Sequence, residues 1–329
     1  MTGCNAAVTV AVLSYNNSRW IEECLESILT QGSASPRLVV IDDGSTDDSH
    51  MLIKDWAAKN WPDAGLYLHH ENRGLVARAN EALNLVDTEF YHLLASDDAL
   101  VPGKLEKQLA MMRRYDGAAL CFTDAELVDE LGDRIAASQS ESVQEKGGPA
   151  PSSMDAASLL LQGAPFCAPT WLIRTICARA VGGYDERFQQ EDVPMFLKLA
   201  TSYPVCQLDE PLVRYRRHSA SLSRSGIPNT AESIVGWCDL LADTRDGVGD
   251  DSAWLPQYRR RAYQVVFTPQ SSVRRVDRVR CARLLVSADR GTLKSRFKAA
   301  LTLVFATTGA GRLAGRLQGS VRNGRRSSK

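Results

Sequence analysis

Apolar segments and amphipathic segments alternate along residues 8–122 of the chain. Short runs that are apolar throughout predict strands with both faces buried, as in a parallel sheet that has helices over each side. Segments in which apolar residues recur every three or four positions predict helices with one buried stripe. The predicted strands are 8–14, 38–41, 66–68, 90–94 and 118–122, and the predicted helices are 19–30, 47–59, 76–85 and 104–114. This alternation predicts an α/β fold with helices on both faces of a parallel sheet.

The pattern becomes less regular after this region. Residues 138–153 are polar and rich in Gly, Pro and Ser, which predicts a mobile loop. A strand near 171–173 and a helix near 193–200 follow it. Beyond residue 225 the chain is expected to be helical and basic, with residues 322–329 disordered. We therefore expect one domain over 1–224, with halves at 1–122 and 123–224, and a helical extension over 225–329.

The formal net charge of zero hides an uneven distribution of charge. Residues 259–329 contain 18 Lys and Arg against two acids, whereas residues 1–258 contain 21 basic and 37 acidic residues. A basic helical extension could lie on anionic lipid. It could equally be a helical subdomain whose basic side chains are solvated or pair with the acidic body. No array of basic and aromatic residues accompanies the charge, so we expect no nucleic-acid partner.

The N-terminal segment is not typical of a secreted or membrane-spanning protein. It lacks the basic start and long apolar core of a secretory signal. No apolar run approaches the roughly 18 residues that a membrane-spanning helix needs. We therefore expect a cytoplasmic protein, with peripheral attachment to the inner face of the membrane as an option through the basic extension.

The first candidate site follows the predicted strand 38–41. Ligands of parallel sheets bind at the carboxyl ends of the strands, so residues at these ends are candidates for chemistry. Asp42 and Asp43 end this strand, and Gly44 permits a sharp turn after them. A carboxylate at this place can accept hydrogen bonds from a base imide N–H or from ribose hydroxyls. The same residues can also form an ordinary turn that caps the next helix.

A second acidic pair, Asp97 and Asp98, follows the predicted strand 90–94. Adjacent carboxylates repel each other and therefore favour a bound cation. Oxygen ligands on a loop suit Mg²⁺ or Mn²⁺, which keep coordination positions open for phosphate oxygens. The alternative is a solvated turn before the next helix.

Two basic motifs have the donors that a diphosphate needs. Gly74 and Arg78 lie at a predicted helix start, where backbone N–H groups and a guanidinium can approach an anion. Arg216 and His218 lie in a second cluster of Arg, His and Ser donors. A helix cap and a basic surface loop are the respective alternatives.

A third acidic pair, Glu191 and Asp192, begins the predicted helix near 193–200. The helix N-terminus stabilises negative charge, and either carboxylate could act as a general base. Ordinary acidic residues in a first helical turn are the alternative.

These motifs occur in one order, each after a predicted strand or at a helix start. In this combination the sequence resembles the family 2 glycosyltransferases, which have the GT-A type nucleotide-diphosphosugar fold. The resemblance covers roughly residues 8–223 and is carried by 9–16, 42–45, 72–74, 96–98, 181–185, 191–192 and 215–221. It implies a single Rossmann-like domain with a mainly parallel central sheet flanked by helices, a nucleotide-binding half over 1–122 and an acceptor half over 123–224.

The resemblance also implies roles for individual residues. Asp192 would deprotonate an acceptor hydroxyl with support from Glu191, and Asp98 would ligate the divalent metal, Mg²⁺ or Mn²⁺. The activity implied is inverting transfer from a nucleotide-diphosphosugar, with a UDP-sugar favoured, to a glycan or lipid-linked acceptor in cell-surface polysaccharide or glycoconjugate synthesis. The residues expected to bind the nucleotide-sugar are Ser14, Tyr15, Asn16, Asp42, Asp43, Asn72, Gly74, Arg78, Ser96, Asp97, Arg216, His218 and Ser221.

The sequence departs from the usual family pattern in three places. Leu13 and Ser14 replace a Pro-Thr pair at the end of the first strand, and Ala95 replaces the first acid of the DxD-like element. The diphosphate arginine usually precedes the helix asparagine directly, whereas Arg78 lies two residues before Asn80. A catalytically silent nucleotide-sugar binding or scaffold protein is therefore the main alternative. A nucleotidyltransferase is less favoured, because the first strand–helix turn lacks a Gly-rich phosphate loop.

Overall fold

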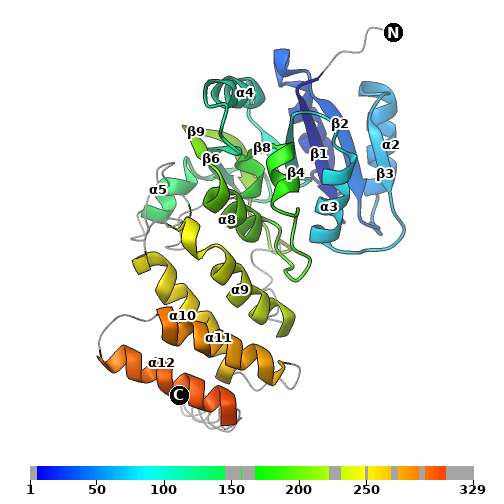
Figure 1. The fold of residues 1–329 in the computed structure, drawn as a ribbon. Helices are drawn as coiled ribbons and strands as arrows, with labels where there is room; N and C mark the ends of the chain where they lie inside the picture. Colours follow the sequence, from blue (N-terminus) through cyan, green and yellow to red (C-terminus); the bar gives the residue numbers. More distant parts are fainter. Residues whose placement is uncertain are drawn as a thin grey trace. The chain divides into compact units, whose positions relative to one another are not determined.

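The computed structural model describes residues 6–144, 157, 167–221, 231–248, 251–267, 273–288 and 293–308. The chain divides into two compact units, Met1–Ile227 and Pro228–Lys329. Figure 1 shows the elements of both units, coloured along the sequence.

Unit 1 is built on one mixed sheet. Its described strands are β1 (Val8–Ser14), β2 (Arg37–Asp42), β3 (Gly65–Leu68), β4 (Phe90–Ala95), β5 (Ala99–Leu100), β6 (Leu120–Val128), β7 (Arg134–Ala136), β8 (Leu172–Arg174) and β9 (Val205–Arg216). Their order is β3-β2-β1-β4-β8-β6-β9-β5, and β7 pairs with β6. The predicted α/β class with a central sheet is thus confirmed.

The orientation of the strands changes half-way across the sheet. β3, β2, β1 and β4 are all parallel, as the alternation of strands and helices predicts. β8 then runs antiparallel to both β4 and β6, and β9 lies parallel to β6 and antiparallel to β5. β9 is absent from the predicted strands, because buried, partly buried and exposed residues follow one another along it without a regular period. It nevertheless ends at Arg216, and the predicted site residues His218 and Ser221 follow it.

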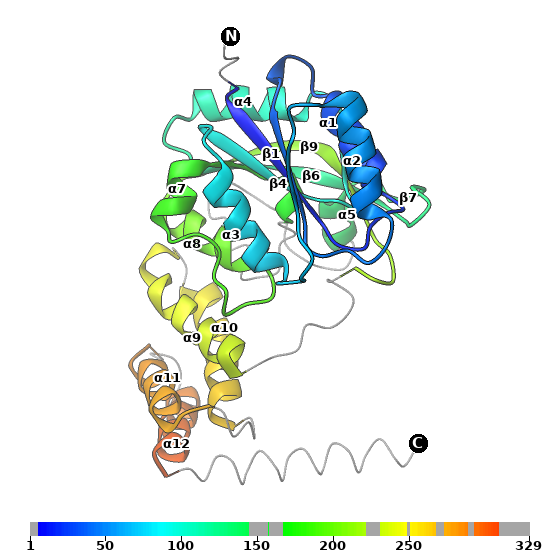
Figure 2. The same ribbon diagram turned by 90° about the vertical axis from the view of Figure 1, so that its right-hand side faces the viewer.

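Helices cover both faces of this sheet, as Figure 2 shows. The described helices of unit 1 are α1 (Ile21–Leu29), α2 (Ser49–Asn60), α3 (Leu75–Leu85), α4 (Lys104–Arg114), α5 (Gln139–Gln144), α7 (Thr175–Ala180) and α8 (Asp192–Ser202). Val8, Val10 and Val12 of β1 belong to the core that α1, α2 and α4 close. α3 packs against β1, β2 and β4. The four predicted helices of the first half agree with α1 to α4 to within two residues at each end.

One predicted loop contains a helix. Residues 139–144 form α5, although the composition of 138–153 predicts a mobile loop. Asp124 of β6 accepts a hydrogen bond from Ser138 Oγ at 2.6 Å and another from Ser140 N at 3.3 Å, so this strand holds the start of the segment. The remainder of the predicted loop, 145–153, lies outside the described residues.

A buried polar cluster lies under α4. Lys104 is fully buried and donates from Nζ to Gln108 Oε1 at 2.7 Å. Gln108 Nε2 in turn donates to Cys121 O and Thr170 O. His92 is also fully buried, and its Nδ1 lies 2.6 Å from the carbonyl oxygen of Trp171. Burial disfavours the charged amine and lowers the pKa of Lys104 to about 7.

Unit 2 is helical in its described part, as the sequence predicts. Its helices are α9 (Ala231–Asp243), α10 (Asp251–Phe267), α11 (Arg275–Ala288) and α12 (Leu293–Thr308). α10 packs against α9 and α11, and α11 packs against α12. Val266, Ala282 and Ala306 form a small core between three of these helices. None of the described helices is long and apolar enough to cross a membrane. The predicted disorder of 322–329 concerns residues outside those described.

Candidate active site

The loops that follow β1, β2 and β4 are joined by hydrogen bonds at one edge of the sheet. Asp43 N donates to Ser14 O at 2.8 Å, which ties the end of β2 to the end of β1. Ser96 N donates to Leu13 O at 3.0 Å and ties β4 to the same strand. Asn17 Nδ2 donates to Ser96 Oγ at 2.8 Å. Predicted site residues far apart in the sequence therefore lie side by side here.

Asp42 orders the turn that follows β2. Its carboxylate accepts hydrogen bonds from Ser45 N at 2.8 Å and Ser45 Oγ at 2.7 Å, and His50 Nε2 lies 2.8 Å from Oδ1. Asn16, with a φ of 52°, accepts from the backbone N–H of Thr46 and donates its own N–H to Ser45 Oγ. Tyr15 beside it stays 47% exposed. The turn is thus fixed by polar contacts, while the Tyr15 ring remains accessible.

Asp43 holds the loop between β3 and α3. Arg73 N and Gly74 N each donate to this carboxylate at 2.8 Å, one to each oxygen. Gly74 has a φ of +90°, a backbone conformation that residues other than glycine rarely adopt, so glycine at this position allows the turn. Asn72 precedes the turn and is exposed. Two oxygens of one aspartate thereby position the start of α3.

Arg78 has protein partners for its whole guanidinium group. Nε donates to Asp43 Oδ1 at 2.6 Å, Nη1 to Glu81 Oε2 at 2.7 Å and Nη2 to Glu71 O at 2.9 Å. The side chain is 5% exposed. Arg78 was predicted to bind the nucleotide-sugar, but its guanidinium instead contacts Asp43, Glu81 and the loop before α3.

The second acidic pair meets the end of β9. Arg216 N donates to Asp98 Oδ1 at 2.8 Å, and Arg216 Nε donates to Asp97 O at 2.9 Å. His218 Nε2 lies 3.0 Å from Asp97 Oδ2. Ser221 Oγ accepts a hydrogen bond from His218 N at 3.1 Å. The pairing of β5 with β9 brings these residues together, since β5 directly follows Asp98.

Arg216 is a buried structural residue in this arrangement. Besides Asp97 O, its guanidinium binds Glu23 Oε2 at 2.6 Å and donates to Asp129 O at 3.1 Å. Its side chain is 1% exposed. Arg216 was predicted to bind a diphosphate. Its three contacts instead join it to the turn after β4, to α1 and to the turn after β6. His218 is the member of this motif that faces an acidic side chain of the pair.

Trp20 is a site residue that the sequence analysis did not identify. It immediately precedes α1, its ring centroid lies 4.3 Å from that of His218, and its Nε1 donates to Glu130 O. The Arg216 guanidinium lies 5.8 Å from the same ring. Nothing in the spacing predicts contacts between residues almost 200 positions apart. The only available signal is a Trp at the start of the predicted helix 19–30.

The third acidic pair belongs to the same electrostatic environment. Asp192 begins α8, and its Oδ1 accepts a hydrogen bond from Val193 N at 2.6 Å. Burial, with the neighbouring charge of Asp192, raises the pKa of Glu191 to about 8, and Asp97 contributes to this shift. Burial also raises the pKa of Asp192. The pKa of Asp98 is raised well above its usual value by burial and then by Asp97, with a contribution from Glu191.

These residues can hold a divalent cation only if phosphate oxygens of a bound substrate supply further ligands. Among the described residues, no three His, Cys, Asp or Glu side chains are grouped so as to hold a metal ion. Asp98 can offer one carboxylate, and Mg²⁺ commonly binds one or two carboxylates with phosphate oxygens and waters as its other ligands. Acidic groups whose pKa values are raised by mutual repulsion are also stabilised by a cation. The donor set therefore suits a metal that arrives with a diphosphate.

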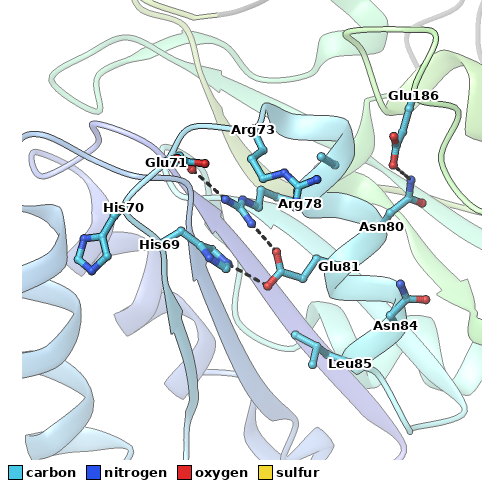
Figure 3. Close-up of a pocket in the computed structure, with 11 residues that line it drawn as sticks. His69, His70, Glu71, Arg73, Arg78, Asn80, Glu81, Asn84, Leu85 and Glu186 are labelled. Atoms are coloured by element: carbon cyan, nitrogen blue, oxygen red, sulfur yellow. Dashed lines mark hydrogen bonds and ion pairs between the residues drawn. The ribbon is translucent and has the colours of Figure 1, made fainter.

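A separate groove of about 740 Å³ lies along α3. His69, Arg73, Asn80, Glu81 and Glu186 are among its lining residues, and Figure 3 shows how they lie. Of the predicted site residues, only Arg78 lines it in the described part of the chain. The groove is therefore not formed by the three acidic pairs.

The comparison with known families decides the class of this site. Residues 9–151 match the family model described as glycosyl transferase family 2. This part of the chain is similar to the family 2 glycosyltransferases. The chain is also similar to EpsE of Bacillus subtilis (strain 168), a protein named as a glycosyltransferase, with 27% identity over 232 residues that cover 69% of this chain and 79% of EpsE.

Solved structures show the same fold for this glycosyltransferase. The chain is similar to S. aureus TarS 1-349 in complex with UDP-GlcNAc, with a TM-score of 0.61, 15% identity, and coverage of 96% of this chain and 92% of that one. It is also similar to the mannosyltransferase PcManGT of Pyrobaculum calidifontis in complex with GDP-Man and Mn²⁺. There the TM-score is 0.56 and the identity 18%, and the match covers 95% of this chain and 86% of that one. The resemblance to this family, the GT-A type fold and the glycosyltransferase class implied by the motifs are thus confirmed.

Proposed function

We propose that this family 2 glycosyltransferase transfers a sugar from a UDP-sugar to an acceptor hydroxyl with inversion at the anomeric carbon. The observation that carries the proposal is the shared electrostatic environment of Asp97, Asp98, Glu191 and Asp192, close to the loops after β1 and β2. A structural relative bound to UDP-GlcNAc supports UDP as the nucleotide. The relative bound to GDP-Man makes GDP the competing choice.

In this proposal the nucleoside lies over the loops after β1, β2 and β3. The exposed Tyr15 ring offers a surface on which a base can stack. Asn16, Asp42 and Asp43 keep these loops in place, and the exposed Asn72 lies two residues before Gly74 in the loop after β3. Ser14 and Ser96 lie at the base of the site, where both side chains are buried.

Asp192 is the proposed general base. Its pKa is raised towards neutral pH, which makes the carboxylate a better acceptor for the proton of the acceptor hydroxyl. Glu191, with a pKa of about 8, holds a proton near neutral pH and so leaves one negative charge on the pair. The acceptor oxygen attacks the anomeric carbon from the face opposite the diphosphate. A single displacement inverts the centre, so one base is sufficient and no covalent sugar–enzyme intermediate forms.

The departing diphosphate requires positive charge. A divalent metal bound at Asp98 would supply Lewis-acid stabilisation of the departing phosphate oxygens. His218 is fixed by Asp97 Oδ2, Ser221 Oγ and the Trp20 ring. In its imidazolium form it can donate a hydrogen bond from Nδ1 in the same place while Nε2 donates to Asp97. The proposed acceptor is a hydroxyl of a glycan or a lipid-linked saccharide, as in the synthesis of cell-surface polysaccharides.

The donor and the stereochemistry are tested together. Calorimetric titration with UDP and with GDP, each with MgCl₂ or MnCl₂, is expected to show tighter binding of UDP. Screening of UDP-sugars for acceptor-independent hydrolysis then identifies the donor, and NMR of the transfer product reports the anomer. We expect the anomer opposite to that of the donor. Retention of configuration would exclude the single displacement, and tighter binding of GDP would exclude the assigned nucleotide.

We also propose that unit 2 binds anionic lipid on the cytoplasmic face of the membrane. Arg275, Val276, Val279, Arg280 and Arg283 line one groove of α11, and Val276 is 62% exposed. Guanidinium groups next to exposed apolar side chains are typical of helices that lie in the interface of a charged bilayer.

Vesicle sedimentation tests this attachment in the full chain. We expect a double substitution, Arg275→Glu with Arg283→Glu, to reduce binding to vesicles that contain anionic lipid by about thirtyfold or more, since each basic residue contributes roughly 1 kcal/mol near such a surface. Arg113→Glu with Arg114→Glu on α4 of unit 1 is the matched control and should leave binding close to that of the wild type. Equal effects of the two pairs would show that overall charge, and not the α11 face, is responsible.

A further inference from the structure

A chain of polar contacts links the groove along α3 to Asp43. His69 Nε2 lies 2.9 Å from Glu81 Oε1, and Arg78 Nη1 donates to Glu81 Oε2 at 2.7 Å. Arg78 Nε then donates to Asp43 Oδ1 at 2.6 Å. Figure 3 shows His69, Glu81 and Arg78 following one another across the groove. Each oxygen of Glu81 therefore has its own partner, one in the groove and one towards the nucleotide loops.

The two residues of this chain of contacts at the Asp43 end are much more buried than the two in the groove. The side chains of His69 and Glu81 are 32% and 26% exposed, whereas those of Arg78 and Asp43 are 5% and 8% exposed. An ion pair with little solvent around it depends on good geometry, because each charge has lost its water. Arg78 is thus held in one orientation by Glu81 on one side and by Asp43 on the other.

The orientation of Asp43 is fixed by three N–H donors. Arg78 Nε and Arg73 N both donate to Oδ1, and Gly74 N donates to Oδ2. Arg78 Nη2 also donates to Glu71 O, so it restrains the loop on both sides of Asn72. Removing Arg78 would leave the buried carboxylate with backbone donors from a loop that has lost its own anchor.

We propose that Arg78 is a positioning residue of the donor site, held by Glu81, which acts through Asp43 and the loop at 71–74 and does not itself contact the diphosphate. This inference rests on the proposed function, because it assigns Arg78 a way of supporting nucleotide binding there. The planar guanidinium contacts three acceptors at once, which a lysine ammonium on a flexible stem cannot reproduce. A direct diphosphate ligand, in contrast, would keep much of its effect as a lysine.

The test compares nucleotide affinity, kcat and stability in five variants of the full chain. The probe is UDP with MgCl₂, or GDP if the wild type binds GDP more tightly. We expect Arg78→Met and Arg78→Lys to weaken binding by about tenfold or more, and Glu81→Gln by roughly three- to tenfold, since a charge-assisted contact is lost in each case. The KM for the donor should rise accordingly while kcat falls by less than about threefold.

Glu186→Gln is the matched control, because this carboxylate lines the same groove and contacts Asn80 instead of Arg78. It should bind nucleotide as the wild type does. The double variant Arg78→Met with Glu81→Gln should lose no more affinity than Arg78→Met alone, since Glu81 acts through Arg78. Urea denaturation checks that each variant is folded, and Glu81→Gln, at the less buried end of the chain of contacts, keeps the test decisive if Arg78→Met unfolds.

The results that would overturn the inference are distinct from those that would overturn the proposed function. If the nucleotide affinity of Arg78→Lys were within twofold of that of the wild type, Arg78 would contribute only its positive charge. If the losses of affinity in the double variant were fully additive, Glu81 would not act through Arg78. A wild type that binds neither UDP nor GDP would contradict the proposed function, and the role of Arg78 in donor binding would fall with it.

Discussion

Asp192→Asn is expected to reduce kcat for sugar transfer by a factor of about 10³, within the range of 10² to 10⁴ that general-base catalysis usually contributes. The amide cannot accept the acceptor proton, yet it has the same shape and can still accept the hydrogen bond that Val193 N gives to Oδ1. The position of α8 should therefore be unchanged. Steady-state kinetics with saturating donor and acceptor measures kcat, and calorimetric titration with UDP should give a dissociation constant within about twofold of the wild type.

Glu191→Gln is the control for this prediction, since it changes the adjacent carboxyl group and keeps Asp192. It should retain far more activity than Asp192→Asn. Glu191 holds a proton below a pH of about 8, and burial is what raises the pKa of Asp192. Replacing Glu191 by a neutral Gln should therefore leave the acid limb of the kcat profile close to that of the wild type. If Asp192→Asn turned over at the wild-type rate, or if Glu191→Gln were the inactive variant, the base would have been assigned to the wrong residue.

Arg216→Met is expected to lower the free energy of unfolding by about 3 kcal/mol. The substitution removes the donors to the carbonyl oxygens of Asp97 and Asp129, and each buried acceptor left without a partner costs roughly 1 to 3 kcal/mol. It also removes one of the two arginine partners of Glu23, the other being Arg214. The transition midpoint in urea, followed by tryptophan fluorescence, should fall with an unchanged slope.

Arg217→Met separates this effect from the loss of one positive charge. Arg217 is half-buried, and its side chain makes no ion pair or hydrogen bond with the other described residues. Its substitution should change stability by no more than about 0.5 kcal/mol. Equal losses in the two variants would mean that Arg216 does not join β9, β4 and α1 as the contacts indicate. A stable but inactive Arg216→Met would instead favour the diphosphate role that the sequence analysis gave it.

The first half of the fold was predictable because its signals are local. Continuous apolar runs gave β1 and β4, and helical periodicity gave α1 to α4, since each pattern is completed within about a dozen residues. β9 has no such pattern. Its 12 residues alternate irregularly between buried and exposed, because they pair with β6 along one edge and with the two-residue β5 along the other. Such pairing depends on contacts over about 100 positions.

The candidate site was predictable in its acidic residues and not in their partners. The motif order indicated that Asp97, Asp98 and the Glu191–Asp192 pair belong together, and their mutual influence on pKa values agrees with this. The roles expected of Arg78 and Arg216 do not match their contacts, because whether a guanidinium is buried or free depends on tertiary packing. Glu81 was missed because a carboxylate in the second turn of a helix is typical of a solvated surface.

The rate at which the buried Lys104 is acylated can report how often unit 1 opens. With a pKa of about 7 its amine is largely uncharged in mildly alkaline buffer, but its side chain has no exposed surface. An acylating reagent can therefore modify it only after α4 separates from the sheet, whereas exposed lysines such as Lys54 and Lys59 on α2 react directly. The rate at which acylated Lys104 accumulates, measured by mass spectrometry, would then depend on how often α4 separates from the sheet and not on the nucleophilicity of the Lys104 amine.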